Sequence, residues 1–272
     1  MFPGVVTDMA YDFPESLTLA QHGRIAVLTL TRVAKRNALD GPTVHALGRF
    51  FQDPPEWARA AVITAEGEHF SAGLDLSELV ERDAMAGVQH SRDWHRVFTA
   101  IEYGALPVVS ALKGAVVGAG LELAATTHLR VAETSTFFAL PEGQRGIFVG
   151  GGAAVRVARL IGVSRMSDLM LTGRVLSAEE GERFGIVHYL VGEGEGLERA
   201  VALAERVAQN SPVSNYAVLQ ALPRIAEADP ETGLMMESLM AGVAQSSPEA
   251  KERLAAFLEG RAAKVRPGGV ER

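Results

Sequence analysis

The stretch KGAVVGAGLE, residues 113–122, places a glycine-rich turn before a helix and a carboxylate in the first turn of that helix. Its three glycines permit backbone conformations and close approaches that a Cβ atom would block. The Leu- and Ala-rich residues that follow favour a helix from about Ala119, whose first N–H groups lack an intrahelical acceptor. Such groups stabilise developing negative charge, and Glu122 lies beside them. The stretch indicates either tight packing of a helix on a sheet or an active site.

Two other turns have the same design. HFSAGLDLSELV (69–80) has small residues at its turn, followed by a helical pattern that we expect to begin at Leu74. GGGAAVRVARLIG (150–162) opens with three glycines before a helix that we expect from about Ala153. Strands, glycine turns and helices alternate up to about Val191, and this alternation predicts an α/β fold.

The remaining segments before residue 195 fit the same alternation. The N-terminus predicts a β-hairpin, because two strand-like runs flank Gln21-His22-Gly23. Residues 78–102 are polar and are interpreted as irregular, so their histidines are given no function. The other expected elements are strands at Ser16–Ala20, Arg24–Thr31, Ala60–Thr64, Leu106–Leu112, Leu129–Glu133, Thr136–Leu140 and 186–191, and helices from Pro42 or Thr43, over Val163–Thr172 and after the N-cap Ser177.

From Leu197 the pattern changes to helices alone. An apolar face repeats there at helical spacing, and three further helices follow it. The third of these four helices, Glu231–Gln245, is rich in methionine, which favours adaptable packing at a core or a subunit contact. We therefore expect a core of residues 1–195 and a C-terminal helical oligomerisation region of residues 196–272.

The composition limits the classes of partner and site. The chain has 272 residues, a formal charge of −7 and no cysteine. It lacks the clustered Lys and Arg of a nucleic-acid-binding face, and no apolar run reaches the roughly 18 residues of a membrane span. Without Cys or an H-E-x-x-H motif, no metal site is predicted. We expect a cytoplasmic protein without a signal peptide that binds neither nucleic acid nor membrane.

Two carboxylates remain as candidates for chemistry. Glu142 follows a predicted strand in a loop, and Glu122 follows another strand at the start of a helix. The motifs of phosphate loops and serine nucleophiles, GxxxxGK[ST] and GxSxG, are absent from the sequence. Paired carboxylates beside free backbone N–H groups are the arrangement expected of acid–base chemistry at an oxyanion hole.

Six short motifs follow one another along the chain. They are AKRNAL (34–39), HFSAGLDLSEL (69–79), KGAVVGAGLELA (113–124), FALPEGQRGI (138–147), LTGRVLSAEEGERFGIV (171–187) and FLEGR (257–261). In this order they make the chain, from about Glu15 to about Lys264, resemble the crotonase superfamily, also called the enoyl-CoA hydratase/isomerase family. The resemblance implies a crotonase-like spiral of repeated β-β-α units and a C-terminal helical region that builds homotrimers, often paired into hexamers. It also implies an acyl-coenzyme A thioester substrate and no separate cofactor, since coenzyme A is part of the substrate.

The resemblance also gives roles to individual positions. The family's two oxyanion donors correspond to the backbone N–H groups of Leu74 and Ala119. Family contacts to the adenine and phosphates of the coenzyme correspond to Lys35, Arg36, Ala38, Ala72 and Asp75. Near the C-terminus, Arg261 or Lys264 is expected to reach the coenzyme of a neighbouring subunit.

Glu122 and Glu142 together indicate the reaction. Family hydratases use carboxylates at these positions to hold a water that adds to C3 of a 2-enoyl thioester while a proton reaches C2. Gly150 matches a position whose backbone helps to place that water. The pair therefore favours an enoyl-CoA hydratase. The alternatives are an enoyl-CoA isomerase or another enolate-forming lyase, which Leu74 favours, and a non-catalytic member that binds acyl-CoA or RNA.

Some residues depart from the family's pattern near the expected acyl pocket. Val149 stands where proline is usual, and Ala153 and Ala154 replace the common Gly-Thr. Arg145 places a charge in a loop that is usually apolar, where it either pairs with a polar acyl group or points to solvent. The length and polarity of the acyl chain therefore stay open.

Overall fold

The computed structural model describes residues 11–78 and 83–261. Its contacts divide the chain into two units, residues up to Ala208 and residues from Gln209. This division lies beyond the one expected at residue 195, because helix α7 (Gly196–Ala208) packs on the main sheet and belongs with the first unit.

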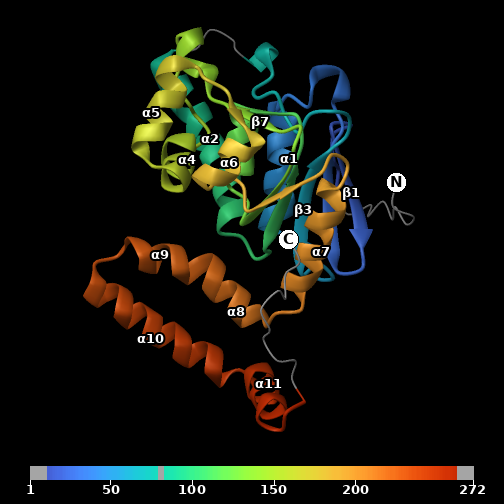
Figure 1. Ribbon diagram of the computed structural model, residues 1–272, viewed down its shortest axis with the longest axis vertical. Coiled ribbons are helices and arrows are strands. Elements are labelled where there is room, and N and C mark those ends of the chain that lie inside the picture. Colours follow the sequence, from blue (N-terminus) through green and yellow to red (C-terminus); the bar gives the residue numbers. More distant parts are fainter. Residues whose placement is uncertain (1–10, 79–82, 262–272) are drawn as a thin grey trace. The chain divides into compact units, whose positions relative to one another are not determined.

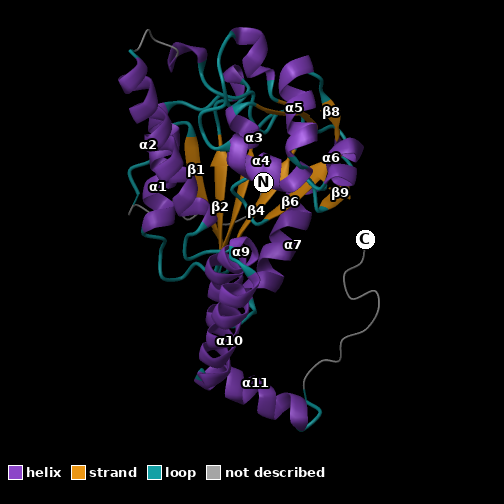
Figure 2. Cartoon of the chain, turned by 90° about the vertical axis from the view of Figure 1, so that its left-hand side faces the viewer, coloured by secondary structure: helices purple, strands orange, loops and turns teal. Residues whose placement is uncertain are grey.

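A six-stranded sheet forms the centre of the first unit. Its strand order is β1-β2-β3-β4-β6-β9; β1 and β2 are antiparallel, and the other neighbours are parallel. Figure 2 shows these strands side by side. The predicted hairpin is confirmed, with Gly23 in its turn at a φ of +60°. The strands are Leu17–His22, Ile25–Leu30, Ala60–Ala65, Val108–Leu112, Leu129–Glu133 and Tyr189–Val191.

A second, three-stranded sheet has the order β5-β7-β8, with strands Ala115–Val117, Phe137–Ala139 and Leu176–Ser177. Two successive repeats of the chain each contribute one strand to each sheet. Strand β4 of the large sheet leads to β5 of the small one and then to helix α3, and β6 leads to β7 and then to α4. This repetition is the predicted spiral of β-β-α units.

The large sheet is covered on both faces, which explains why its strands are almost continuously apolar. On one face the core includes Leu28, Ile63 and Phe98, together with the buried sides of α1 and α2. On the other face Val27, Val62 and their neighbours pack against α7, which lies over β3 (Figure 1). The first of these cores extends to Glu122's neighbours Leu121 and Leu123, so it also fixes the helix that carries Glu122.

The helices of the first unit begin and end at recognisable signals. Asp40 caps α1 through the Thr43 N–H, and Ser177 and Glu180 form the predicted capping box of α6. The helices are α1 (Gly41–Gln52), α2 (Ala84–Glu102), α3 (Ala119–Ala124), α4 (Ala153–Ile161), α5 (Val163–Thr172), α6 (Ala178–Phe184) and α7. None of the helices in the described ranges combines the length and apolar character that a membrane crossing needs.

Two predictions about residues 74–102 were wrong. Most of residues 78–102, interpreted as irregular, form α2, whose buried side chains Trp94, Val97, Phe98 and Ile101 recur at helical spacing. No helix begins at Leu74. Backbone bridges from Leu74 to Leu39 and from Ser71 to Val116 keep this segment extended, and only a short 3₁₀ turn, Leu76–Glu78, follows it.

The second unit is helical, as predicted. It contains α8 (Pro212–Tyr216), a π-helical turn (Ala217–Ala221), α9 (Leu222–Glu227), α10 (Pro230–Ser246) and α11 (Pro248–Leu258). The π turn precedes Pro223, whose ring nitrogen cannot donate to the helix ladder. Large apolar side chains on α10 and α11 are exposed in this chain, and assembly into trimers or hexamers stays a prediction. They are Leu234, Met235, Leu239, Val243, Leu254, Phe257 and Leu258.

Candidate active site

A cavity of about 660 Å³ lies where the three glycine turns meet. The turns at 71–73, 118–120 and 150–152 come from different units of the spiral, and the structure brings them to one place. The sequence-predicted residues that line the cavity are Ala72, Leu74, Ala119, Glu122, Glu142 and Gly150. Lys35, Arg36, Ala38 and Asp75 are not among its lining residues.

Two backbone segments approach each other closely at the inner end of this site. A Cβ atom at Gly73 would lie 2.9 Å from the carbonyl oxygen of Val117 and 3.6 Å from the nitrogen of Ala119. Gly73 also has a φ of +104°, which L side chains rarely adopt. The glycine therefore lets the chain at Leu74 lie directly beside the start of α3.

The N–H groups of Leu74 and Ala119 have no acceptor within the described residues. The bridge to Leu39 uses the carbonyl of Gly73 and the N–H of Asp75, so the Leu74 N–H faces away from that strand. Ala119 is the first residue of α3, where the sequence predicted a free N–H. The structure thus provides two unoccupied backbone donors on adjacent segments.

Glu122 is buried in the first turn of α3, with 4% of its surface exposed. Its Oε1 accepts the N–H groups of Gly151, at 2.7 Å, and Ala153, at 3.1 Å. A Cβ atom at Gly151 would lie 2.6 Å from Oε2, so only a glycine lets the turn lie against the carboxylate. Burial raises the pKa of Glu122 above its usual value, and the N–H donors and the charge of Arg156 offset only part of this rise.

Glu142 lies in the short 3₁₀ helix η3, Pro141–Arg145, across the same cavity. A Cβ atom at Gly118 would lie 2.7 Å from its Oε1, which places the carboxyl beside the N-terminus of α3. Its Oε2 is buried and has no hydrogen-bond partner among the described residues. Burial raises the pKa of Glu142, and the nearby charge of Glu122 raises it further.

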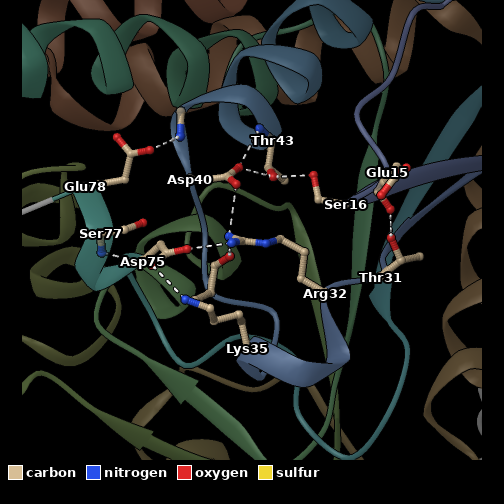
Figure 3. Close-up of polar contacts among 12 residues, drawn as sticks. Glu15, Ser16, Thr31, Arg32, Lys35, Asp40, Thr43, Asp75, Ser77 and Glu78 are labelled. Atoms are coloured by element: carbon tan, nitrogen blue, oxygen red, sulfur yellow. Dashed lines mark hydrogen bonds and ion pairs between the residues drawn. The ribbon is translucent and has the colours of Figure 1, made fainter.

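Asp75 is buried, and its carboxylate points toward Arg32 and Ser77 (Figure 3). Its Oδ2 accepts from Arg32 at 2.6 Å, and its Oδ1 accepts the Ser77 N–H at 3.0 Å. The Ser77 N–H and the Arg32 guanidinium hold the pKa of this carboxyl well below its usual range. Arg32 also contacts Asp40 at 3.0 Å, so it joins the Leu74 segment to the cap of α1.

The other predicted coenzyme contacts lie around this ion pair. Lys35 is exposed and its Nζ lies 3.7 Å from Asp75 Oδ1. Arg36 has a φ of +50°, and its carbonyl accepts the N–H of Ala72. The carbonyl of Ala38 accepts from Arg32. Coenzyme binding by these residues stays a prediction.

The C-terminal candidates add no observed contact to the site. Arg261 pairs with Glu259 within the second unit, and Lys264 lies outside the described residues. In the described ranges, no three His, Asp or Glu side chains are grouped so as to hold a metal ion.

Helix α2 supplies one wall of the cavity that the sequence interpretation missed. Ser91 donates to the carbonyl of Gly150 at 2.6 Å, and burial lowers the pKa of the nearby His95. The signal that would have revealed this wall is the helical spacing of Trp94, Val97, Phe98 and Ile101. Further lining residues are His90, Arg92, Arg145, Ile147 and Phe148.

Comparisons with known proteins agree with this fold. The sequence matches the family model for enoyl-CoA hydratase/isomerase over residues 20–266. It is 31% identical to a short-chain-enoyl-CoA hydratase of Clostridium acetobutylicum, over 90% of this chain and 95% of that one. It is 30% identical to the 2,3-dehydroadipyl-CoA hydratase of Escherichia coli, over 90% and 96%. A crystal structure from Rhodopseudomonas palustris, named provisionally as an enoyl-CoA hydratase, is 57% identical with a TM-score of 0.90, over 94% and 99%.

Proposed function

The chain belongs to the enoyl-CoA hydratase/isomerase family, the crotonase superfamily, and we propose that it adds water across the C2=C3 double bond of a 2-enoyl-coenzyme A thioester. The observation that carries the proposal is the pair of carboxylates, Glu122 and Glu142, that face one cavity beside two free backbone donors. The relatives named as enoyl-CoA hydratases support the same reaction.

The thioester carbonyl oxygen is proposed to accept the N–H groups of Leu74 and Ala119. Negative charge grows on this oxygen as C3 is attacked and the enolate forms. Donors already in place stabilise that charge without reorganising, and one such donor is typically worth about 3 kcal/mol in the transition state. Backbone donors suit this task because their direction is fixed by Gly73 and by the start of α3.

Glu122 is proposed as the base that removes a proton from the attacking water. Two N–H groups bind its Oε1, which favours the ionised carboxylate and leaves Oε2 to accept from water. The water oxygen then forms the bond to C3, while the π electrons pass to the carbonyl oxygen. The N–H of Gly150 has no acceptor among the described residues and is proposed to help place the water.

Glu142 is proposed as the acid that delivers a proton to C2. It lies beside Gly118, next to the donor of Ala119, and therefore near the thioester end of the substrate. Burial and the charge of Glu122 raise the pKa of Glu142, which is the direction expected for a group that donates a proton. The enolate collapses as C2 takes this proton, and the proton removed by Glu122 restores Glu142 through solvent.

The acyl group is proposed to include molecules with a distal carboxylate. Arg92 and Arg145 line the cavity. Neither forms a hydrogen bond or ion pair with another described residue, although the charge of Arg145 acts on Glu142 and lowers its pKa. A carboxylate on the acyl chain would provide a partner for one of them. The relative named 2,3-dehydroadipyl-CoA hydratase supports this extension.

The proposed reaction can be tested with crotonyl-CoA and with a 2-enoyl-CoA that ends in a carboxylate. Hydration removes the conjugated absorbance of either substrate. We expect turnover of both, a higher kcat/KM for the carboxylate substrate, and loss of that preference in Arg145→Gln. Absence of hydration across chain lengths would contradict the proposal, and faster conversion of a 3-enoyl-CoA to a 2-enoyl-CoA would identify an isomerase instead.

A further inference from the structure

A buried guanidinium lies behind Glu122, outside the cavity. Arg156, in α4, is 9% exposed and is not among the described residues that line the cavity. Its Nε donates to Glu102 Oε2 at 2.6 Å and its Nη2 to Thr99 Oγ1 at 3.3 Å, both near the end of α2. Its Nη1 donates to the carbonyl of Gly151 at 3.0 Å. The planar fork of an arginine allows one side chain to join these three acceptors.

The 150–152 turn is fixed at two successive peptide groups. In the first, the Gly150 carbonyl accepts from Ser91 at 2.6 Å, and the Gly151 N–H donates to Glu122 at 2.7 Å. In the second, the Gly151 carbonyl accepts from Arg156. Rotation of the first peptide plane would turn the Gly151 N–H away from Glu122. Rotation of the second would shift the chain that leads to the Ala153 N–H, the other donor to Glu122. Side chains of α2 and α4 therefore determine the direction of the donors that bind Glu122.

Gly152 provides the space for this arrangement. Its φ is +110°, and a Cβ atom here would lie 2.2 Å from Nη1 of Arg156. An L side chain at this position would be strained and would also displace the guanidinium. The third glycine of the turn is thus explained by Arg156 rather than by contact with a substrate.

The charges of Glu102, Arg156 and Glu122 alternate in sign, with Arg156 acting on both carboxylates. The carboxylate of Glu102, whose side chain is 20% exposed, compensates the charge of Arg156. The positive charge of Arg156 opposes the effect of burial, which raises the pKa of Glu122. Without Arg156, Glu122 would keep the burial and lose a nearby cation, so its neutral form would be favoured.

We propose that Arg156 is a positioning residue for hydration: with Glu102 as its counter-ion, it fixes the 150–152 turn so that Gly151 and Ala153 hold Glu122 oriented and ionised as the base. The role in catalysis rests on the proposed hydration. The effect on Glu122 itself does not, because it follows from contacts within the protein.

Other charged or titratable groups line the cavity that Glu122 lines, and they stay unchanged in all of the variants that test the proposal. Their charges set the background against which a change at Arg156 is measured. They are Glu142 and Arg145 from η3, and His90, Arg92 and His95 from α2.

The first experiment measures kcat, KM and the pH profile of enoyl-CoA hydration in Arg156→Gln. We expect kcat to fall about tenfold to a hundredfold, the range seen when groups that orient a reactive residue are removed, with KM within about twofold. The acidic limb of the profile should move to higher pH, because Glu122 protonates more readily. Arg156→Lys should return the acidic limb to its wild-type pH, since it keeps the positive charge. It should not restore kcat, since lysine lacks the planar fork of donors that joins the three acceptors.

Arg159→Gln is the matched control. Arg159 is on the same helix, is 46% exposed, and lies 3.9 Å from Glu102. The variant makes the same change of charge at a side chain that is far more exposed than Arg156, so kcat and the pH profile should stay within about twofold of the wild type.

The second experiment needs no substrate. In protein labelled with carbon-13 at the glutamate carboxyls, the Glu122 signal is identified by its loss in Glu122→Gln and is titrated with pH. Its midpoint should rise in Arg156→Gln, stay unchanged in Arg159→Gln and fall in Glu102→Gln, where Arg156 is no longer compensated. If Arg156→Gln does not fold, the titration midpoint of Glu122 is measured in Arg156→Lys and Glu102→Gln instead.

The proposal is overturned if Glu122 titrates as in the wild type in folded Arg156→Gln and Glu102→Gln. It is also overturned if kcat falls only in proportion to lost thermal stability, with no movement of the pH limb. If the wild type hydrates no enoyl-CoA but the titrations shift as expected, the proposed function fails while the effect of Arg156 on Glu122 stands.

Discussion

Glu122 and Glu142 face the same cavity from two different kinds of structure. Glu122 lies in the first turn of a buried helix and accepts two backbone N–H groups from the 150–152 turn. Glu142 lies in a short 3₁₀ helix followed by exposed residues, among them Ile147 and Phe148 at 42% and 69%, and its Oε2 has no partner among the described residues. The Glu122 carboxylate is fixed by hydrogen bonds from a buried turn, whereas Oε2 of the Glu142 carboxylate has no such bond within the described residues.

This difference suggests a division of work within the site. A base that must be ionised and aimed at one water benefits from fixed hydrogen bonds and a rigid helix. The segment from Glu142 to Phe148 is more open to variation, because substitutions there disturb few buried contacts. We therefore expect changes around Glu122 to act on kcat and stability, and changes after Glu142 to act on the choice of acyl group.

The largest effect is expected from removing either carboxylate. Glu122→Gln and Glu142→Gln should each lower kcat for hydration about 10²- to 10⁴-fold, the usual contribution of a general acid or base. Steady-state kinetics with a 2-enoyl-CoA measure this. If Glu142→Gln keeps most of its activity, Glu142 is not the acid, and the claim that both carboxylates are catalytic is wrong.

A smaller effect is expected from adding a methyl group beside Glu142. Gly118→Ala would place a Cβ 2.7 Å from Glu142 Oε1 at a φ of +52°, and should lower kcat at least about tenfold by displacing the acid and the Ala119 donor. Gly146→Ala is the matched control: its φ is +70°, but nothing lies within 4 Å of the added atom. Gly146, with a ψ of 20°, lies in the left-handed helical region, so Gly146→Ala should lose about 1 kcal/mol of stability from backbone strain. Gly118, with a ψ of −122°, lies outside that region, so Gly118→Ala should lose more stability, and only Gly118→Ala should lose kcat. Equal losses of kcat would show that strain alone explains the effect.

The exposed segment should affect substrate choice instead. Phe148→Ala is expected to change the ratio of kcat/KM between short and longer enoyl-CoA substrates by about tenfold, because one apolar contact is worth about 1–3 kcal/mol and a contact with an exposed side chain lies at the low end of that range. Its thermal stability should stay within about 0.5 kcal/mol of the wild type, since the side chain is exposed. An unchanged ratio with a lowered kcat for all substrates would contradict the division of work.

The smallest effect concerns stability and pH. Burial raises the folded-state pKa of Glu122, so this group favours folding below the pKa of an unfolded glutamate, and that contribution is lost as the pH rises through the folded-state pKa. Glu122→Gln should therefore gain stability relative to the wild type, by about 1 kcal/mol, at pH 7 and not at pH 4. Glu142 is more exposed than Glu122, so Glu142→Gln should gain less stability at pH 7 than Glu122→Gln. Thermal melts at both pH values measure this, and a larger gain at pH 4 would reverse the assigned sign.

Part of this site could be predicted from local sequence. The helix start at Ala119 and the place of Glu122 in its first turn follow from glycines next to a helix-forming run, and the structure has both. The capping box at Ser177 is equally local. Such features depend on a few neighbouring residues, so the sequence determines them directly.

Other parts depend on contacts between distant segments. The Leu74 segment has a helical pattern, but bridges to Leu39 and from Ser71 to Val116 keep the chain extended, so tertiary pairing overrides the local signal. Helix α2 was missed because its polar face obscured the spacing of four buried side chains. The partners of Arg156 lie 5 and more residues away along the chain, up to 57 for Thr99, and no local pattern brings them together.

The most direct test of the central claim is to incubate the protein with a 2-enoyl-CoA in heavy-oxygen water and to analyse the product by mass spectrometry. Two carboxylates acting on one water predict a product that has gained one labelled water, with the heavy oxygen at C3, and formation of that product at least about a hundredfold more slowly in Glu122→Gln and in Glu142→Gln. A product of unchanged mass, or labelled hydration that keeps its wild-type rate without these two carboxylates, would contradict the account.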